Sequence, residues 1–496
     1  MTFPSRPSRP LTLKAALKQL DESWEIIESF RSLHQEHEQL KQDFIELSQR
    51  LDEVVSQLHS SSRNSSKPPS SDTPEQKAKR PRQRQRSPRQ KGGQPGHPRH
   101  ERALLPEQDV DQVKQYFPHP QCECGGAVVT EQQPHCRHQL WDILPIRMNV
   151  TEHQFFKGTC RGCGQAHFSQ WPDWLPRGQM GAGLISWIGM LSGQYHLSIR
   201  QIQSLLLEMC RTTFSTGAIS NAQGKLSEWM EAPYQQVGDY VRQQDVAHSD
   251  ETRHSHKHST HAYWMWTLVS GPFCLFLTHF SRGKQAAKIL LGAFSGYLVT
   301  DHYAAYNDYP RDKHQLCWAH LLRHFLKISE RRGQAGAIGK RLLLIGHAVI
   351  RTHHRFANDP DKVTTYHRRM QRLRRSFQAT LEKGKRLNPL VASRTYNQCI
   401  HLLKDEDLCW TFLQNPLIPL TNNRAESALR PYVIWRKLSF ATQSLQGLRF
   451  RPMILTVTTT ARQLGMSSLD VLREISEQGL SRKPVTFRFP FDQRIA

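Results

Sequence analysis

Three acidic residues that lie far apart in the chain, Asp250, Asp301 and Glu426, carry side chains suited to chemistry on phosphodiesters. Three carboxylates can hold two Mg²⁺ ions roughly 4 Å apart, which activate a water or a 3′-hydroxyl and stabilise the leaving oxygen at phosphorus. Phosphodiesters repel nucleophiles because they are charged, and hard cations with oxygen ligands offset that charge. The trio is therefore the candidate catalytic and metal site, with Mg²⁺ or Mn²⁺ as the cofactor.

Each of these acids, taken alone, also has an ordinary explanation. Asp250 and Asp301 each lie near the end of an apolar strand pattern, where a capping aspartate is at least as common as a catalytic one. Glu426 falls in the first turn of a helix that Asn422 or Asn423 can cap, and a lone glutamate there is more often a solvated helix residue. The hypothesis therefore depends on the three acids together.

The elements around these acids predict a mixed sheet covered by helices. Residues 261–270 and 272–280 are rich in aromatic and β-branched side chains, and a Gly-Pro turn separates them. A meander followed by a helical crossover fits an α/β fold. A helical stretch around 184–230 comes first, and the expected order after it is strands at 245–252, 261–270 and 272–280, a helix at 283–294, and strands at 296–301 and 313–320.

The positive charge of the chain is concentrated in two segments. The formal net charge is +24, of which residues 61–100 contribute +9 and residues 320–400 contribute +14. Such an excess indicates a polyanionic partner, either nucleic acid or an anionic membrane surface. Because the charge is concentrated rather than diffuse, it suits binding to a phosphate backbone.

The sequence contains no sign of a membrane or secreted protein. No apolar run approaches the roughly 20 residues of a membrane span, and the amino terminus lacks the apolar core of a secretory signal. Four of the ten cysteines lie in two close pairs and the rest are scattered. This pattern favours a reducing cytoplasm and a metal site over a disulfide framework.

A heptad pattern runs from Ile26 to Leu58. Apolar side chains recur at alternating steps of four and three, and His37 is the one exception among ten positions. The pattern predicts a coiled-coil helix over residues 15–60 and self-association. The alternative is an amphipathic helix that packs on its own domain.

A disordered basic linker is expected over residues 61–105. Seven prolines between residues 61 and 100, with little apolar content, predict disorder. A flexible spacer is the simpler alternative, but the density of arginine favours phosphate contact. The candidate DNA-binding side chains are Lys77, Lys79, Arg80, Arg82, Arg84, Arg86, Arg89 and Lys91.

Two cysteine pairs, Cys122 with Cys124 and Cys160 with Cys163, predict a zinc-ribbon-like module. Each pair precedes a glycine, which lets the backbone turn so that its N–H groups face thiolate sulfur. The second pair has the common spacing of two residues, whereas the first has only one intervening residue. His119 or Cys136 could therefore replace a ligand, and cysteines without a metal are the alternative.

Further motifs follow one another in order along nearly the whole chain: a leucine-rich amino-terminal helix, NSSKPPSSD, KGGQPGHP, the cysteine-pair module, SDET, VTDHYAAY, CWAHLLRHF, NNRAESALRP and RPMILTVTTTARQLG. In this order they resemble the transposases of insertion sequence 66, bacterial enzymes of the ribonuclease-H-like DDE superfamily. Any one motif alone is unspecific, but so many in order are highly specific.

The resemblance implies that Asp250 of SDET, Asp301 of VTDHYAAY and Glu426 of NNRAESALRP are the metal-binding catalytic acids. Cys317 and His320 fit a Cys-x-x-His signature of related transposases, and we expect them to position the active-site strand and helix rather than to bind zinc. The chain departs from the family in two places. Serine follows Glu426 where the family usually has arginine, and the first cysteine pair is shortened.

The resemblance also implies a domain order. A ribonuclease-H-like catalytic domain at 241–318 and 415–445 is interrupted by a basic helical insertion at 319–414. The other expected parts are the coiled-coil helix (15–60), the basic linker (61–105), the zinc-binding-like module (106–172), a helical region (180–240) and a carboxyl-terminal helical segment (446–496).

The expected function is transposition, in which double-stranded DNA is cut and joined at the terminal inverted repeats of the chain's own element. A homo-oligomer in the bacterial cytoplasm, associated with the nucleoid, is expected, and accessory proteins of the same element are possible further partners. A catalytically inactive DNA-binding relic or regulator is the alternative, although retention of all three acids favours activity. An RNA nuclease of similar fold is disfavoured by the basic insertion and the coiled coil.

Overall fold

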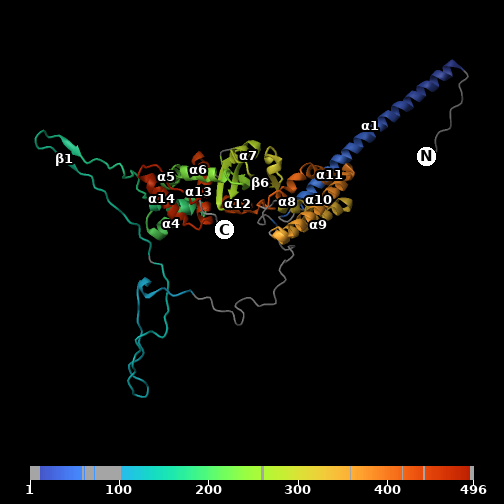
Figure 1. Cartoon of the computed structure of the whole chain (residues 1–496). Helices are drawn as coiled ribbons and strands as arrows, with labels where there is room; N and C mark the ends of the chain where they lie inside the picture. The colour runs from blue at the N-terminus through green and yellow to red at the C-terminus, as the bar shows by residue number, and fades with distance from the viewer. Residues whose placement is uncertain are drawn as a thin grey trace. The chain divides into compact units, whose positions relative to one another are not determined.

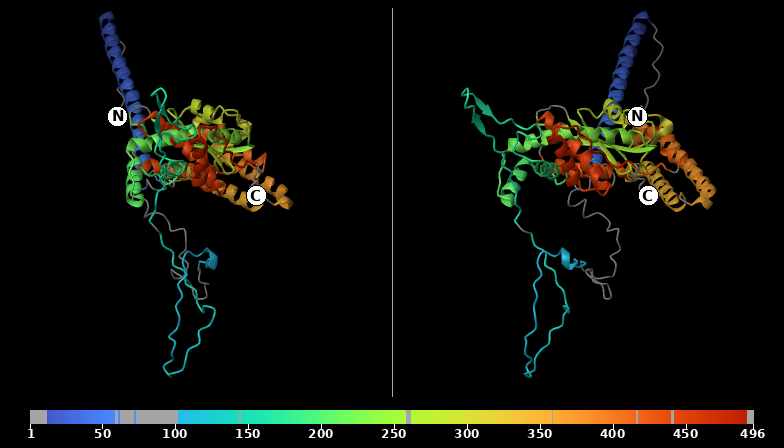
Figure 2. Two further views of the ribbon diagram at one scale, coloured as in Figure 1. Left: turned by 90° about the vertical axis from the view of Figure 1, so that its left-hand side faces the viewer. Right: turned by 60° about the vertical axis from the view of Figure 1, so that its left-hand side comes forward.

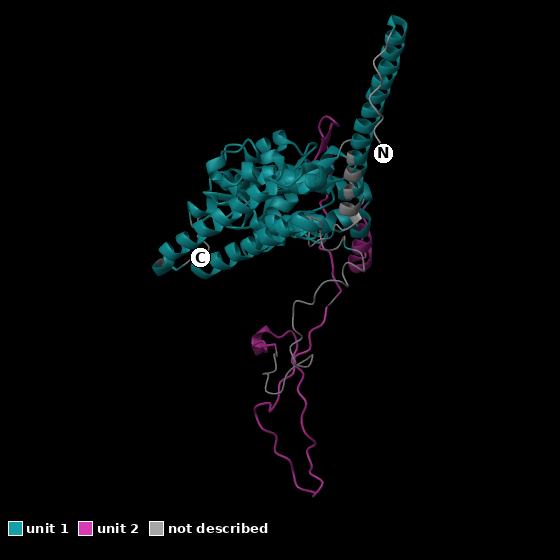
Figure 3. Cartoon of the chain, turned by 90° about the vertical axis from the view of Figure 1, so that its right-hand side faces the viewer, with its two compact units in different colours: residues 1–78, 170–202, 215–496 teal, residues 79–169, 203–214 magenta. Residues whose placement is uncertain are grey.

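The computed structural model describes residues 12–58, 61, 72, 102–143, 145–257, 262–357, 359–415, 417–439 and 442–491. It divides into two compact units, which are coloured separately in Figure 3. The first unit comprises residues 1–78, 170–202 and 215–496 and contains the sheet, and the second comprises residues 79–169 and 203–214. Within the described part of the chain, no helix is long and apolar enough to cross a membrane.

A five-stranded mixed sheet is the centre of the first unit (Figure 1). Its spatial order is β5-β4-β3-β6-β7, so β3 is the middle strand. β3 pairs antiparallel with β4 and parallel with β6. The strands are β3 (Val246–His254), β4 (Tyr263–Ser270), β5 (Phe273–His279), β6 (Tyr297–Thr300) and β7 (His314–Leu316), and α7 (Lys284–Leu291) joins β5 to β6.

The predicted order of three strands, a helix and two strands is confirmed, but the last strand is much shorter than predicted. Only three residues of the expected strand at 313–320 are extended, and α8 (Trp318–Ser329) begins directly after them. The reason is the spacing of the apolar residues that follow. Trp318, Leu321, Phe325 and Ile328 recur at helical steps, and the helix buries all four.

Helices cover both faces and one edge of the sheet. Figure 1 shows α7 and α12 (Asn423–Leu438) on opposite sides of the strands. At the β5 edge, α13 (Leu445–Gln463) places two buried threonines against the strand. Thr456 accepts the N–H of Phe276 at 3.0 Å and Thr460 accepts that of Cys274 at 3.3 Å, so this edge is not left unpaired.

Further helices pack around this edge of the unit. Between α3 and α14 and between α5 and α13 the contacts are extensive, and α6 packs on β5. α4 belongs partly to each unit. These helices are α3 (Ala182–Gly193), α4 (Ile199–Cys210), α5 (Thr216–Trp229), α6 (Glu231–Arg242) and α14 (Ser468–Leu480).

Between β7 and α12 the chain forms a helical excursion whose long helices lie side by side in Figure 2. Its side chains share one buried core with β6 and β7, in which Val299 and Leu316 of the strands join Trp318, Phe377 and Trp410. The excursion is therefore packed onto the sheet. After α8 it contains α9 (Gly333–Phe356), α10 (Val363–Lys385) and α11 (Pro389–Lys404).

The heptad segment forms a single helix, α1 (Leu13–Leu58). Its apolar side chains are exposed, as at Phe30, Leu40 and Leu47, where about two thirds of each side chain is accessible (66%, 68% and 66%). The helix that the sequence predicts is thus present, whereas its pairing with a second copy stays a prediction.

Among its described residues, the second unit has little regular structure beyond its share of α4. It contains the short helix η2 (Glu107–Asp109) and a hairpin of β1 (Lys157–Thr159) and β2 (Ala166–Phe168). This hairpin brackets the second cysteine pair.

Candidate active site

Asp250 and Asp301 come from neighbouring parallel strands. In the pairing of β3 with β6, His248 lies beside Val299. Carried two residues further, the same register sets Asp250 beside Asp301, which directly follows the last residue of β6. Adjacent strands are roughly 4.8 Å apart, so the two carboxylates start from neighbouring points on the sheet.

Each aspartate is oriented by a backbone amide close to it. Oδ1 of Asp250 accepts the N–H of Glu251 at 2.9 Å, and Oδ1 of Asp301 accepts the N–H of Tyr303 at 3.1 Å. Such bonds favour the ionised form of a carboxyl group and restrict its rotation. They therefore fix one oxygen of each acid.

Glu426 reaches this region from the first turn of α12, which packs on β3 and β4. Its Oε2 lies 3.4 Å from Nη2 of Arg323, and its Oε1 lies 3.5 Å from Nε2 of His320, both on α8. The Oε1 atom is buried and has no hydrogen-bond partner among the residues that the structure describes. A buried carboxylate oxygen without a partner is costly, and a cation would satisfy it.

The three acids lie within one another's electrostatic field. Burial, together with the charges of Glu251, Asp301 and Glu426, raises the pKa of Asp250 well above its usual value. Burial and the charge of Glu251 also raise the pKa of Asp301, to about 7, and Glu426 contributes to that rise. Negative charges that raise the pKa of neighbouring carboxyl groups mark a place where a bound cation is strongly favoured.

The donor set fits a hard divalent ion, although the side chains as placed do not surround one. Across the described residues, no three or more His, Cys, Asp or Glu side chains form a group that could hold a metal ion. The three acids offer only oxygen ligands, which suit Mg²⁺ or Mn²⁺. The unpartnered oxygen of Glu426 and the raised pKa values of both aspartates support that fit.

A comparison with protein families decides the identity. The profile of the Transposase IS66 family matches residues 177–449, more than half of the chain. The chain belongs to the IS66 family of transposases. Membership implies DNA as the partner and a divalent metal as the cofactor. A profile described as a family of unknown function (DUF6444) matches residues 11–103, and a search of curated proteins gives no match.

Cys317 and His320 of this transposase both lie beside the acids. Cys317 donates its N–H to the carbonyl of Thr300, the residue before Asp301, at 2.8 Å. His320 faces Glu426, and burial lowers its pKa while Glu426 raises it. Cys317 is thus bonded to the residue before Asp301, and His320 lies next to Glu426.

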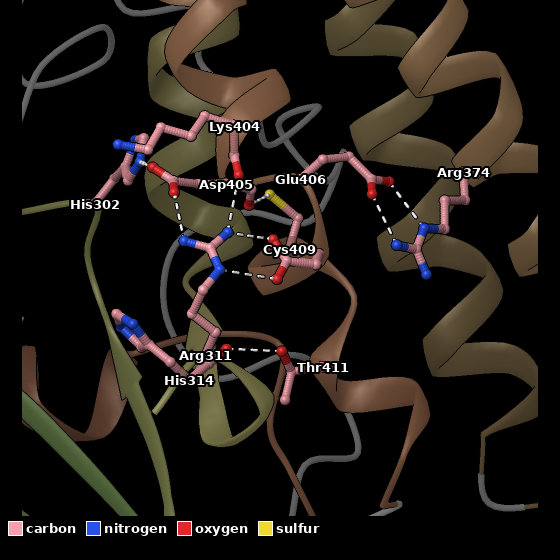
Figure 4. A network of polar contacts seen from close by, with 10 residues as sticks. His302, Arg311, His314, Arg374, Lys404, Asp405, Glu406, Cys409 and Thr411 are labelled. Carbon is pink, nitrogen blue, oxygen red and sulfur yellow. Dashed lines mark hydrogen bonds and ion pairs between the residues drawn. The ribbon is translucent and has the colours of Figure 1, made fainter. Parts of the chain in front are cut away.

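A polar network joins the end of the helical excursion to the residue that follows Asp301 (Figure 4). Nε2 of His302 lies 2.9 Å from Oδ2 of Asp405, just after α11. Arg311 binds the other oxygen of Asp405 at 3.0 Å and also pairs with Asp407. The half-buried Asp405 and the exposed Asp407, both at the end of the excursion, therefore hold the segment that carries Asp301.

The sequence interpretation missed an ion pair close to the aspartates. Side chains alternate along a strand, so Glu251 points away from Asp250. Its partners lie elsewhere: Arg282 binds its Oε1 at 2.8 Å and Tyr306 donates to its Oε2 at 3.1 Å. Glu251 is not inert, however, because its charge raises the pKa of Asp301, which Arg282 lowers. A local pattern offered no signal for Arg282, since it lies 31 residues from its partner.

The cysteine pairs form separate turns, and the expected four-thiolate group is not formed. Gly125 and Gly164 have positive φ angles of 88° and 72°, as expected for turns after each pair. Backbone N–H groups lower the pKa of Cys124 (from Gly126) and of Cys160 (from Cys163 and Gly162). Among the residues described here, no three or more possible metal ligands form a group that could hold an ion. The structure therefore does not support the zinc ribbon predicted from Cys122, Cys124, Cys160 and Cys163.

Basic side chains are concentrated in the linker and in the helical excursion. The candidate DNA-binding side chains from Lys77 to Lys91 lie outside the described residues. In the helical excursion, three arginines of α10, Arg368, Arg372 and Arg375, are exposed. Because they are spaced by four and three residues, they share one face of the helix.

Proposed function

We propose that this transposase cuts and joins double-stranded DNA at the terminal inverted repeats of its own insertion sequence. Asp250, Asp301 and Glu426 are the catalytic acids. The observation that carries the proposal is the convergence of three acids from separate parts of the chain. The parallel register of β3 and β6, carried two residues further, supports the pairing of Asp250 with Asp301, and Glu426 belongs to α12, which packs on β3 and β4.

We further propose a ribonuclease-H-like catalytic domain. The strand order β5-β4-β3-β6-β7, with three antiparallel strands followed by a helix and two parallel strands, supports this. In such open α/β sheets, ligands bind beyond the carboxyl ends of parallel strands, and Asp301 lies at one of those ends. The domain boundaries given by the sequence remain part of the proposal.

The three acids would bind the metal through carboxylate oxygens, with Glu426 offering Oε1, which no described residue hydrogen-bonds. Bound there, Mg²⁺ or Mn²⁺ supplies activation of a water or 3′-hydroxyl and neutralises charge that develops on the leaving oxygen. Arg323 orients Glu426 at 3.4 Å. The exposed arginines of α10 bind the DNA backbone, together with the basic linker from Lys77 to Lys91.

Two further parts of the proposal concern assembly and zinc. A pair of α1 helices would cover their exposed apolar side chains and join two copies of the transposase, one for each element end.

The two cysteine pairs would bind one Zn²⁺ once their turns come together, since backbone N–H groups already favour thiolate at Cys124 and Cys160.

Glu426→Gln tests the proposal directly, because it keeps the size of the side chain and removes one charge. We expect cleavage of DNA that carries the element ends, in Mg²⁺ or Mn²⁺, to fall by orders of magnitude. DNA binding should persist, because the basic segments are unchanged. Glu477→Gln makes the same chemical change at an exposed position of α14 and should cleave like the wild type.

The possible results separate the candidate functions. Cleavage by Glu426→Gln at the wild-type rate would show that the three-acid assignment is wrong. A wild-type protein that binds element ends but shows no metal-dependent cleavage would instead be the inactive DNA-binding relic or regulator.

A further inference from the structure

Asn422, the residue before α12, is fully buried and turns its side chain toward the central strand. Its Nδ2 donates to the carbonyl oxygen of Ser249 at 2.8 Å. Its Oδ1 lies 3.3 Å from Nδ1 of His248. The carbonyl of Ser249 can only accept a hydrogen bond, so the amide nitrogen of Asn422 must face it. The amide oxygen then faces His248, whose Nδ1 is the donor in that contact.

The backbone of Asn422 makes two more bonds. Its N–H donates to Sγ of Cys317 at 3.1 Å, and Cys317 in turn donates to the carbonyl of Thr300. Its carbonyl accepts the N–H of Glu426 at 3.3 Å. Asn422 therefore bonds directly to Glu426 and to the residue before Asp250, and it bonds through Cys317 to the residue before Asp301.

Helix capping does not explain this arrangement. An asparagine at this position usually accepts an N–H of its own helix, and the serines that precede α5, α13 and α14 do so. The side chain of Asn422 makes no such bond. The helix thus gives up a stabilising cap, while the amide is used to join α12 to β3.

We propose that Asn422 is a positioning residue that sets the separation of Glu426 from the two aspartates and thereby the metal affinity of the site. This inference rests on the proposed function of the three acids. A residue that orients metal ligands usually changes metal affinity or activity by about 10- to 100-fold when it is lost.

The experiment compares Asn422→Ala with two controls in the full-length protein. Asn423→Ala makes the same change at the next, exposed position. Tyr432→Phe removes a buried hydrogen bond to His254 farther along the same contact between α12 and β3. For each protein, Mn²⁺ affinity is measured by calorimetry, and cleavage of element-end DNA is measured across a range of Mn²⁺ concentrations.

We expect Asn422→Ala to weaken Mn²⁺ binding by about 10- to 100-fold, with cleavage partly restored at saturating Mn²⁺. Asn423→Ala and Tyr432→Phe should bind Mn²⁺ like the wild type, although Tyr432→Phe should melt at a lower temperature. If Asn422→Ala does not fold, Asn422→Ser, which keeps a polar group too short to reach both strand residues, is judged by the same criteria.

Unchanged Mn²⁺ affinity in the Asn422 variant would overturn the inference. So would an equal loss of affinity in Tyr432→Phe, because the effect would then follow from general destabilisation. If the wild type binds no Mn²⁺, or Glu426→Gln binds it equally well, the proposed function fails instead.

Discussion

The Glu251–Arg282 ion pair beside Asp301 makes an asymmetric prediction about stability. The side chain of Glu251 is 1% exposed, whereas that of Arg282 is 39% exposed. Removal of Arg282 leaves a carboxylate in the interior without its cation. Removal of the charge on Glu251 leaves a guanidinium that still reaches water and stacks over the rings of Trp264 and Tyr303.

The magnitudes follow from which partner is left behind. Arg282→Met should lower the free energy of unfolding by about 3–5 kcal/mol, the usual cost of leaving a buried charge unpaired. Glu251→Gln should lower it by about 1–3 kcal/mol, because a neutral amide still bonds to its neighbours. The double variant should be more stable than Arg282→Met alone, since it leaves no unpaired charge at position 251.

Urea unfolding of the three variants at pH 7.5, followed by tryptophan fluorescence, measures these differences. Arg449→Met is the matched control: its partner Glu231 lies at the surface, and both side chains are almost half exposed (49% and 41%). We expect its effect to stay within about 1 kcal/mol. The reasoning is refuted if Glu251→Gln costs as much as Arg282→Met, or if the double variant loses the sum of both.

Three other predictions follow from the same structure. Replacing Leu40 and Leu47, both exposed on α1, with charged residues should convert the oligomer to a monomer in sedimentation experiments. An oligomer that is unchanged by both substitutions would exclude α1 as the interface. Purified protein should contain about one Zn²⁺ that is lost on changing Cys160 and Cys163 to Ser, whereas elemental analysis that detects no zinc in the reduced wild type would end that proposal. Burial lowers the pKa of His314 to about 4, so the stability that the neutral imidazole contributes is present above about pH 6.5 and is lost as the pH falls toward 4. Between pH 7.5 and 5.5 the free energy of unfolding of the wild type should fall by about 1 kcal/mol more than that of His314→Gln, and equal losses would contradict this prediction.

The sequence predicted the elements around the acids well because the patterns that define them are local. The aromatic and β-branched residues of β4 and β5 and the strand that ends before Asp301 were all recognised in their order. The predicted length of the last strand was wrong because KHQLCWAH contains both a strand pattern and the first turn of a helix. Trp318 is buried as part of that helix, and the tertiary core decided between the two.

Contacts between distant residues were beyond what a local pattern can show. Asn422 or Asn423 was predicted to cap a helix, a role that their neighbours in the chain suggest, but the side chain of Asn422 bonds to residues more than 170 positions away. The pairing of Glu251 with Arg282 was missed for the same reason. Both contacts depend on which face of the sheet each neighbouring element covers, and the hydrophobic pattern of each element alone does not specify that.

The placement of Glu426 depends on how the two ends of the long helical excursion are joined. The chain leaves the sheet at Cys317 and returns at Asn422, and these residues are bonded to each other, while Trp318 donates its N–H to the carbonyl of Leu420 at 2.9 Å. The excursion thus begins and ends at the same point. The entropic cost of closing a longer loop rises by only about 0.6 kcal/mol for each doubling of its length. The bonds at this junction therefore govern where Glu426 lies relative to Asp301, and a large basic helical segment can lie between these two residues without displacing either.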